Sequence, residues 1–260
     1  MDSPDDVTVI PHTTIRRRIA KHMVMSQSTS AHAFAMIDVD YGAIDVVRGT
    51  LGARWKEECG YSLSYLPFVA RAVLLGIGQF PKLNARFADS GLEVLGEIGL
   101  GIAVDLEFEG LVVPVIPQAG SLHVPELAST IHELADRTRQ GKLTSNDVSG
   151  GTVTVSNPGP FGARITVPII NQPQVAILTI DAIALRPAVS TDAQGNPSLV
   201  VRPIGNLTLA WDHRAFDGAY ATSALTAIRA TLESHDWRSE FGSSWFSPAQ
   251  SSSSTASMPS

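Results

Sequence analysis

Residues that could handle a proton stand near the end of the chain, in the segment WDHRAFDGAY (211–220). This segment places His213 four residues before Asp217, and Gly218 follows directly. Histidine titrates near neutral pH, which suits it to general-base chemistry, and loops at strand ends commonly carry functional residues. A capped turn with solvated charges would produce the same spacing, so the spacing alone leaves both interpretations open.

A second candidate is the hydroxyl of Ser156, which ends the alternating strand pattern in GGTVTVSNPGPFG (150–162). At the end of a strand, a hydroxyl could donate a hydrogen bond to an oxygen that becomes negative during acyl transfer. The same hydroxyl could equally bond a backbone group in the glycine- and proline-rich turn that follows. The residue type therefore allows oxyanion stabilisation without requiring it.

The composition excludes several classes of function. The net charge of -6 and the pI of about 5.6 argue against a nucleic-acid binder or a membrane-surface binder, which usually carries a basic face. No apolar run reaches the length of roughly 20 residues that spans a bilayer. The seven histidines show no metal-ligand spacing, so we expect no metal site. A single cysteine, Cys59, forms no internal disulfide and fits a reducing compartment, the cytoplasm or the mitochondrial matrix.

The elements that must position these residues follow from the periodicity of apolar side chains. Helices are predicted at 13–28, at 42–59, from 64 to a stop near Pro81, at 124–143 and at 219–234. Strands are predicted at 33–41, twice within 97–119 around a turn at Glu109 and Gly110, before Ser156, and within 172–183 and 199–212. Strands and helices mix without strict alternation, which predicts an α/β two-layer sandwich, one mixed β-sheet covered by helices. We expect a flexible N-terminal arm at 1–10, one domain at 11–246 and a disordered serine-rich tail at 247–260.

Five stretches give the chain a resemblance to a known family. These stretches are DHRAFDG, GGTVTVSNPGPFG, IINQPQVAIL, GLVVPVI and IRRRIAKHM. Over about residues 11–235 the chain resembles the catalytic domain of dihydrolipoamide acyltransferases, the core subunits of 2-oxo acid dehydrogenase complexes. The wider superfamily shares the short pattern H-x-x-x-D-G and includes chloramphenicol acetyltransferase. The resemblance thus implies a chloramphenicol acetyltransferase-like fold.

The resemblance also implies a mechanism. His213 would take the proton from the thiol of coenzyme A or of dihydrolipoamide, and the thiolate would attack the partner's thioester carbonyl. Ser156 would donate a hydrogen bond to the tetrahedral oxyanion. Asp217 would order the site by pairing with a basic side chain. Arg16, in the matching N-terminal segment, is the candidate partner and a candidate cofactor-binding residue, the alternative being a solvated charge.

Three further residues are candidates for contact with the substrates. His32 and Phe34 match a P-H-F stretch of the family near the lipoamide channel, although Ala33 is inserted between them, and packing is the alternative role. Asn157 either holds the turn after the serine or touches coenzyme A. Direct transfer between two thiols needs no covalent enzyme intermediate, which leaves Cys59 a structural role.

The resemblance finally implies partners. The lipoyl group would come from another domain or chain, because the lipoyl and partner-binding domains of full-length members are not in this sequence. A homotrimer is expected, with His213 and Ser156 contributed by neighbouring chains. The segment SHDWRSEFGSSWFSPAQ replaces the apolar end that joins family trimers, so the sequence gives no support for a larger core. Two alternatives stay open: a non-catalytic trimeric scaffold of a dehydrogenase complex, and the same chemistry with a small-molecule acceptor.

Overall fold

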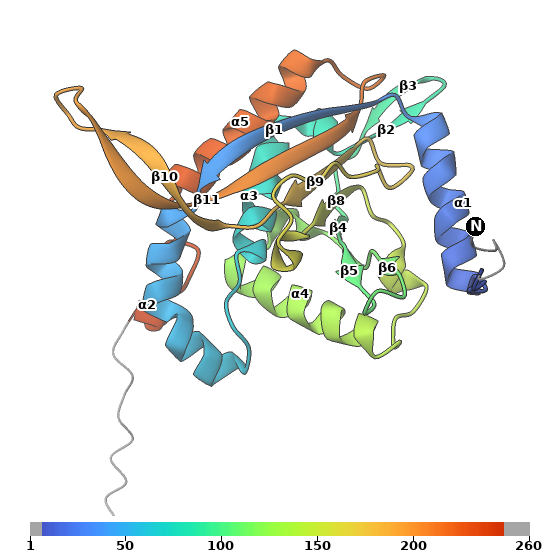
Figure 1. Ribbon diagram of the computed structural model, residues 1–260, viewed down its shortest axis with the longest axis horizontal. Helices are drawn as coiled ribbons and strands as arrows, with labels where there is room; N and C mark the ends of the chain where they lie inside the picture. The colour runs from blue at the N-terminus through green and yellow to red at the C-terminus, as the bar shows by residue number, and fades with distance from the viewer. Residues whose placement is uncertain (1–6, 247–260) are drawn as a thin grey trace, which may run out of the picture.

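A mixed β-sheet forms the centre of the computed structural model, which describes residues 7–246 (Figure 1). The strands lie in the order β1-β11-β9-β8-β4-β7, and β10 pairs with the far end of β11. Their bounds are β1 His32–Asp40, β4 Leu100–Ile102, β7 Val115–Ile116, β8 Val153–Ser156, β9 Ala176–Ile180, β10 Ala184–Thr191 and β11 Pro197–Asp212. The predicted tail at 247–260 and residues 1–6 of the predicted arm lie outside the described residues.

Helices cover one face of this sheet, which confirms the predicted two-layer architecture (Figure 1). The helices are α1 Thr14–Thr29, α2 Gly42–Cys59, α3 Leu66–Gln79, α4 Val124–Arg139 and α5 Gly218–Ser234. Alternate strand residues point into this layer and are buried, among them Val155, Leu178 and Leu209. Removing such side chains from water supplies the main driving force for folding. Helix α1 instead runs beside one end of the sheet.

Strand direction decides where the candidate residues lie. Strand β8 runs parallel to both β4 and β9, whereas β11 runs antiparallel to β9 and to β1. The carboxyl ends of β8 and β11 therefore point to opposite ends of the sheet. Ser156 ends the first of these strands and His213 follows the second, so the topology separates them.

The predicted helices are confirmed, and local chemistry explains two of their ends. Helix α2 stops at Gly60, whose φ of 84° is a left-handed conformation that favours glycine. Gly141, with φ of 66°, follows the end of α4 in the same way. The predicted turn near Glu109 also forms, although the flanking strands are broken into β4, β5 Val104–Asp105, β6 Leu111–Val112 and β7.

Two hairpins were not predicted. Strands β2 Ala85–Ala88 and β3 Gly91–Val94 form a small separate sheet, each only four residues long. Strand β10 pairs with the first half of β11 and projects from the body of the molecule (Figure 1). Pro187 lies within β10, and a proline weakens any sequence-based strand assignment.

Candidate active site

His213 stands just beyond the end of β11 with its side chain half exposed. Its backbone N–H donates to the carbonyl of Ala31 at 2.8 Å, which ties it to the segment between α1 and β1. Its Nδ1 lies 3.7 Å from a carboxylate oxygen of Asp217, so the four-residue spacing does bring the two side chains together. Asp217 occupies the N-cap position of α5, and its side chain is exposed. The imidazole is thus accessible to a substrate and faces a negative charge.

An ion pair between a buried aspartate and a partly exposed arginine lies directly beside this histidine. The Asp212 side chain, only 2% exposed, accepts bonds from Arg214 Nε at 3.0 Å and Arg214 Nη2 at 2.6 Å. Burial opposes ionisation of this carboxyl, but hydrogen bonds from Arg214 and Ser30 outweigh it and hold the pKa of Asp212 below its usual value. The guanidinium also lies 4.4 Å from the centre of the Phe87 ring. The site therefore contains a fixed charged pair next to its candidate base.

Ser156 ends β8 on the face of the sheet that points away from the helical layer. Its neighbour Val155 is buried in the core, and successive side chains of a strand point to opposite faces. The turn that follows is held by Asn157, whose Oδ1 accepts a bond from the N–H of Gly159 at 3.2 Å. Any Cβ on Gly159 would lie 2.8 Å from the Asp181 carbonyl, so the turn requires glycine there.

Sheet register shows how far Ser156 lies from His213 within one chain. Ser156 pairs with Thr179, and Thr179 pairs with Thr208 on β11. His213 is five residues beyond Thr208, which corresponds to about 16 Å along the strand, and β8 lies two strand spacings, about 10 Å, to the side. The two side chains are thus on the order of 19 Å apart in one chain. They cannot act on one carbonyl unless two chains meet.

The pairing of Arg16 with Asp217 is not formed within one chain. The Arg16 guanidinium donates to the carbonyl of Glu109 at 3.2 Å, near the start of α1. Only the C-terminal end of α1 approaches His213, through Ala31. Arg16 lies about fourteen residues before that end, and a helix rises 1.5 Å per residue, so Arg16 is about 20 Å from the His213 segment. The sequence-based assignment of this partner is therefore wrong for a single chain.

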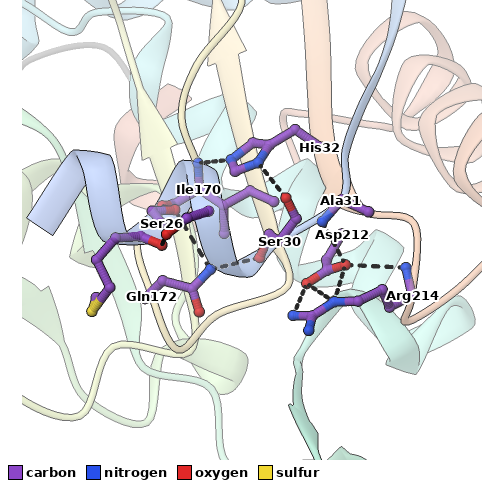
Figure 2. Close-up of polar contacts among 10 residues, drawn as sticks. Ser26, Ser30, Ala31, His32, Ile170, Gln172, Asp212 and Arg214 are labelled. Carbon is purple, nitrogen blue, oxygen red and sulfur yellow. Dashed lines mark hydrogen bonds and ion pairs between the residues drawn. The ribbon is translucent and has the colours of Figure 1, made fainter.

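His32 has a structural role in the described part of the chain. Its Nε2 accepts the N–H of Ile170 at 3.1 Å, so the proton resides on Nδ1, which donates to the Ser30 carbonyl at 3.1 Å. Both ring nitrogens are used within the chain, which favours the packing alternative for His32. Phe34 stacks on this ring at 6.2 Å and is partly exposed on β1. Figure 2 shows this network, which joins α1, β1 and the loop around Ile170.

A cavity of about 400 Å³ opens beside the turn after Ser156. Its lining includes Asn157, Phe161, Tyr61, His132 and Arg139. The Tyr61 and His132 rings stack 3.9 Å apart along one wall. Asn157 thus holds the turn and also lines the cavity.

Other groups are placed away from this chemistry. Cys59 is exposed at the end of α2, and partial burial together with Glu58 raises the pKa of its thiol. Within residues 7–246, no three His, Cys, Asp or Glu side chains gather as a metal site would require. None of the helices in that same range is both long and apolar enough to cross a bilayer.

Sequence reasoning missed Asp212 and Arg214. The signal that could have found them is an acidic residue at the end of an alternating apolar strand. If the strand end is buried, the carboxylate needs a charged or hydrogen-bonding partner. The basic residue two positions later was visible in the same motif. The stretch IINQPQ also had no assigned role, and it proves to hold the end of α1 through Ile170 and Gln172.

Comparison with known proteins identifies the family. Residues 4–237 match the model of the 2-oxoacid dehydrogenases acyltransferase (catalytic domain). The chain is 36% identical over 227 residues to the lipoamide acyltransferase component of the branched-chain alpha-keto acid dehydrogenase complex of Bacillus subtilis, covering 87% of this chain and 52% of that protein. It is 38% identical over 230 residues to the dihydrolipoyllysine-residue acetyltransferase component of the pyruvate dehydrogenase complex of Mycobacterium bovis, covering 88% and 41%. The chain therefore spans about half the length of the curated relatives it matches.

Solved structures agree with this assignment. A probable dihydrolipoamide acetyltransferase from Listeria monocytogenes superposes with a TM-score of 0.82 at 37% identity, covering 87% of this chain and 94% of that one. A dihydrolipoamide acetyltransferase from Azotobacter vinelandii, studied for the roles of one serine, one histidine and one asparagine in its catalytic mechanism, gives 0.82 at 27% identity, covering 92% and 98%. A chloramphenicol acetyltransferase gives 0.50 at 12% identity, covering 87% and 99%, which confirms the fold. The chain belongs to the 2-oxoacid dehydrogenase acyltransferase (catalytic domain) family.

Proposed function

We propose that the chain transfers an acyl group between a lipoyl thiol and coenzyme A. The observation that carries this proposal is the exposed His213 imidazole beside Asp217, at the end of a strand, in a chain of this family. In the related enzyme from A. vinelandii, the histidine and the asparagine studied for catalysis are four positions apart, the spacing of His213 and Asp217 here. The names of the curated relatives include a lipoamide acyltransferase and an acetyltransferase.

In the proposed reaction His213 acts as a general base. Because Nδ1 faces Asp217, the Nε2 atom is the one that receives the thiol proton. The thiolate attacks the thioester carbonyl, and the Ser156 hydroxyl donates a hydrogen bond to the oxyanion that forms. The tetrahedral intermediate then collapses, and the departing thiolate takes the proton back from the imidazolium.

Each proposed active site is completed by two chains of a homotrimer. The support is the separation of about 19 Å between His213 and Ser156 within one chain, derived from strand spacing. One thiol substrate would then approach from the Ser156 side of one chain, and the other would approach from the His213 side of its neighbour.

An exposed apolar surface on the β10–β11 hairpin supports the proposed subunit contact. Cross-strand pairing places six apolar side chains on one side of the hairpin, which we call the hairpin face. The hairpin face consists of Leu185, Pro187, Val189, Leu199, Val201 and Pro203. Four of them are large and well exposed in a single chain. Contiguous apolar surface of this kind commonly marks a contact between proteins.

The test is acyl transfer with defined substrates. The protein is incubated with dihydrolipoamide and, in turn, acetyl-, succinyl- and isobutyryl-coenzyme A, and the acylated product is measured by mass spectrometry. We expect His213→Ala to lower turnover by about 10² to 10⁴, and Ser156→Ala by about 10² to 10³. Unchanged turnover in His213→Ala would discard the assignment. Absence of transfer by the folded wild type would favour a scaffold or a different acceptor.

A further inference from the structure

We propose that Asp212 is a positioning residue for His213, acting through a clamp on the backbone at both sides of the catalytic base. This inference rests on the proposed function, because it assigns a role to the residue that precedes the proposed base. Asp212 itself does not reach the substrate: its side chain is buried and its oxygens are occupied by Arg214 and Ala31. Its effect would be exerted through the orientation of the neighbouring imidazole.

The geometry of the clamp is specific. Asp212 Oδ1 accepts the backbone N–H of Ala31 at 3.3 Å and the backbone N–H of Arg214 at 3.0 Å. The carbonyl of the same Ala31 accepts the N–H of His213 at 2.8 Å. One carboxylate therefore fixes the residue after the histidine and also the residue that holds the histidine's own amide. Displacement of that carboxylate would release both restraints.

The charge of Asp212 is part of the clamp. The Arg214 guanidinium adds three contacts to the two carboxylate oxygens, at 2.6, 3.0 and 3.1 Å. Hydrogen bonds to an ionised group are roughly twice as strong as those between neutral groups. An amide in place of the carboxylate would keep the shape but would lose the negative charge that organises these donors. Asn at this position is therefore the informative substitution.

A second set of contacts supports the clamp from the side of α1. Gln172 Nε2 donates to Ser30 Oγ at 2.6 Å, and Ser26 Oγ donates to the Ile170 carbonyl at 2.5 Å. These bonds dock the end of α1 onto the loop before β9, next to Ala31 (Figure 2). These contacts fix the residues before Ala31. The bond from Asp212 then fixes Ala31 itself, whose carbonyl holds the His213 amide.

The expected effect of losing the clamp follows from the demands of proton transfer. A general base must lie within hydrogen-bonding distance of the thiol, and a misplacement of about 1 Å can cost about 100-fold in rate. We expect Asp212→Asn to lower kcat by about 10- to 100-fold. The KM for each substrate should stay within about twofold, because no binding group is removed.

The matched control is Asp147→Asn. Asp147 also pairs with an arginine, Arg137, at 2.5 Å, but it lies in the turn after α4, away from the β11 end. Its substitution should leave kcat within about twofold, as expected for a distant site. A second variant, Arg214→Lys, keeps a positive charge but not the planar fork. Arg214→Lys should also lower kcat, by a smaller factor. It provides the test of the clamp if Asp212→Asn does not fold.

The second readout is hydrogen exchange at the backbone amide of His213, which does not depend on activity. In Asp212→Asn this amide should exchange at least about tenfold faster, whereas in Asp147→Asn it should not change. A normal kcat in folded Asp212→Asn, unchanged exchange at this amide, or an equal loss of kcat in Asp147→Asn would each overturn the proposal. If the wild type shows no acyl transfer, the proposed function fails, and the exchange rates alone decide whether the clamp positions His213.

Discussion

Val201→Asp tests the proposed contact between chains at the hairpin face. Val201 is 67% exposed in one chain and lies in the middle of this face, paired with Pro187. Fully burying a valine side chain contributes about 1.5 to 3 kcal/mol, so covering the exposed two thirds would contribute about 1 to 2 kcal/mol. A carboxylate at this position would remove that contribution and would also leave an unpaired charge in the contact, at a cost of several kcal/mol.

The substitution should therefore weaken association by at least about tenfold for each subunit contact, since about 1.4 kcal/mol corresponds to a factor of ten. Sedimentation velocity over a range of micromolar concentrations gives the size of the assembly, and the acyl-transfer assay on the same samples gives its activity. The matched control is Val94→Asp, which places the same charge on an exposed valine of the separate β2–β3 hairpin. We expect the assembly of Val201→Asp to dissociate towards monomer and its acyl-transfer activity to fall in parallel. Val94→Asp should keep the assembly size and the activity of the wild type. An active wild-type monomer at high dilution would refute the reasoning.

Two further predictions concern other parts of the chain. Glu240→Gln should destabilise the fold by about 3 to 5 kcal/mol in chemical denaturation, because Glu240 is 3% exposed and its substitution leaves Arg71, 3.0 Å away, without its counter-charge. Glu93→Gln, in an exposed pair with Arg86, should cost less than about 1 kcal/mol. Burial opposes ionisation of Glu240, but hydrogen bonds from Arg71 and His123 hold its pKa below the usual value. The ionised carboxylate therefore stabilises the folded state fully above about pH 4.3, the pKa of an unfolded glutamate. This stabilisation is lost as the pH falls through the lower pKa of the folded state. Cys59→Ser should leave turnover within about twofold, because the raised pKa of this thiol keeps it protonated, and a large loss would reveal a role for the thiolate.

Most of the helical layer could be predicted from local pattern. The helix predicted over 124–143 is found at Val124–Arg139, because its apolar positions recur three and four residues apart and Gly141 provides a left-handed end. The short strands of the β2–β3 hairpin and the proline-containing β10 could not be predicted with the same rules. Their formation depends on pairing with other segments, which periodicity within one segment does not report.

The residue types of the candidate site could also be identified from the sequence, but their arrangement could not. The four-residue spacing allowed His213 and Asp217 to meet but left a capped turn equally open, and the structure places the two side chains 3.7 Å apart. The distance between His213 and Ser156 depends on strand direction, since β8 is parallel to β9 and β11 is antiparallel to it. The importance of Asp212 depends on its burial against Arg214 and the end of α1, a tertiary property that no local spacing reveals.

The most direct test of the shared active site is complementation between two defective chains. His213→Ala and Ser156→Ala chains are co-expressed in equal amounts and purified together, without separating mixed from unmixed trimers, and acyl transfer is measured beside each variant alone. In a cyclic trimer with sites between neighbours, random mixing leaves about one quarter of the sites with both residues intact, so activity should return to about one quarter of the wild-type value. Activity no greater than the average of the two separate variants would contradict the account, because it would mean that His213 and Ser156 do not meet across chains.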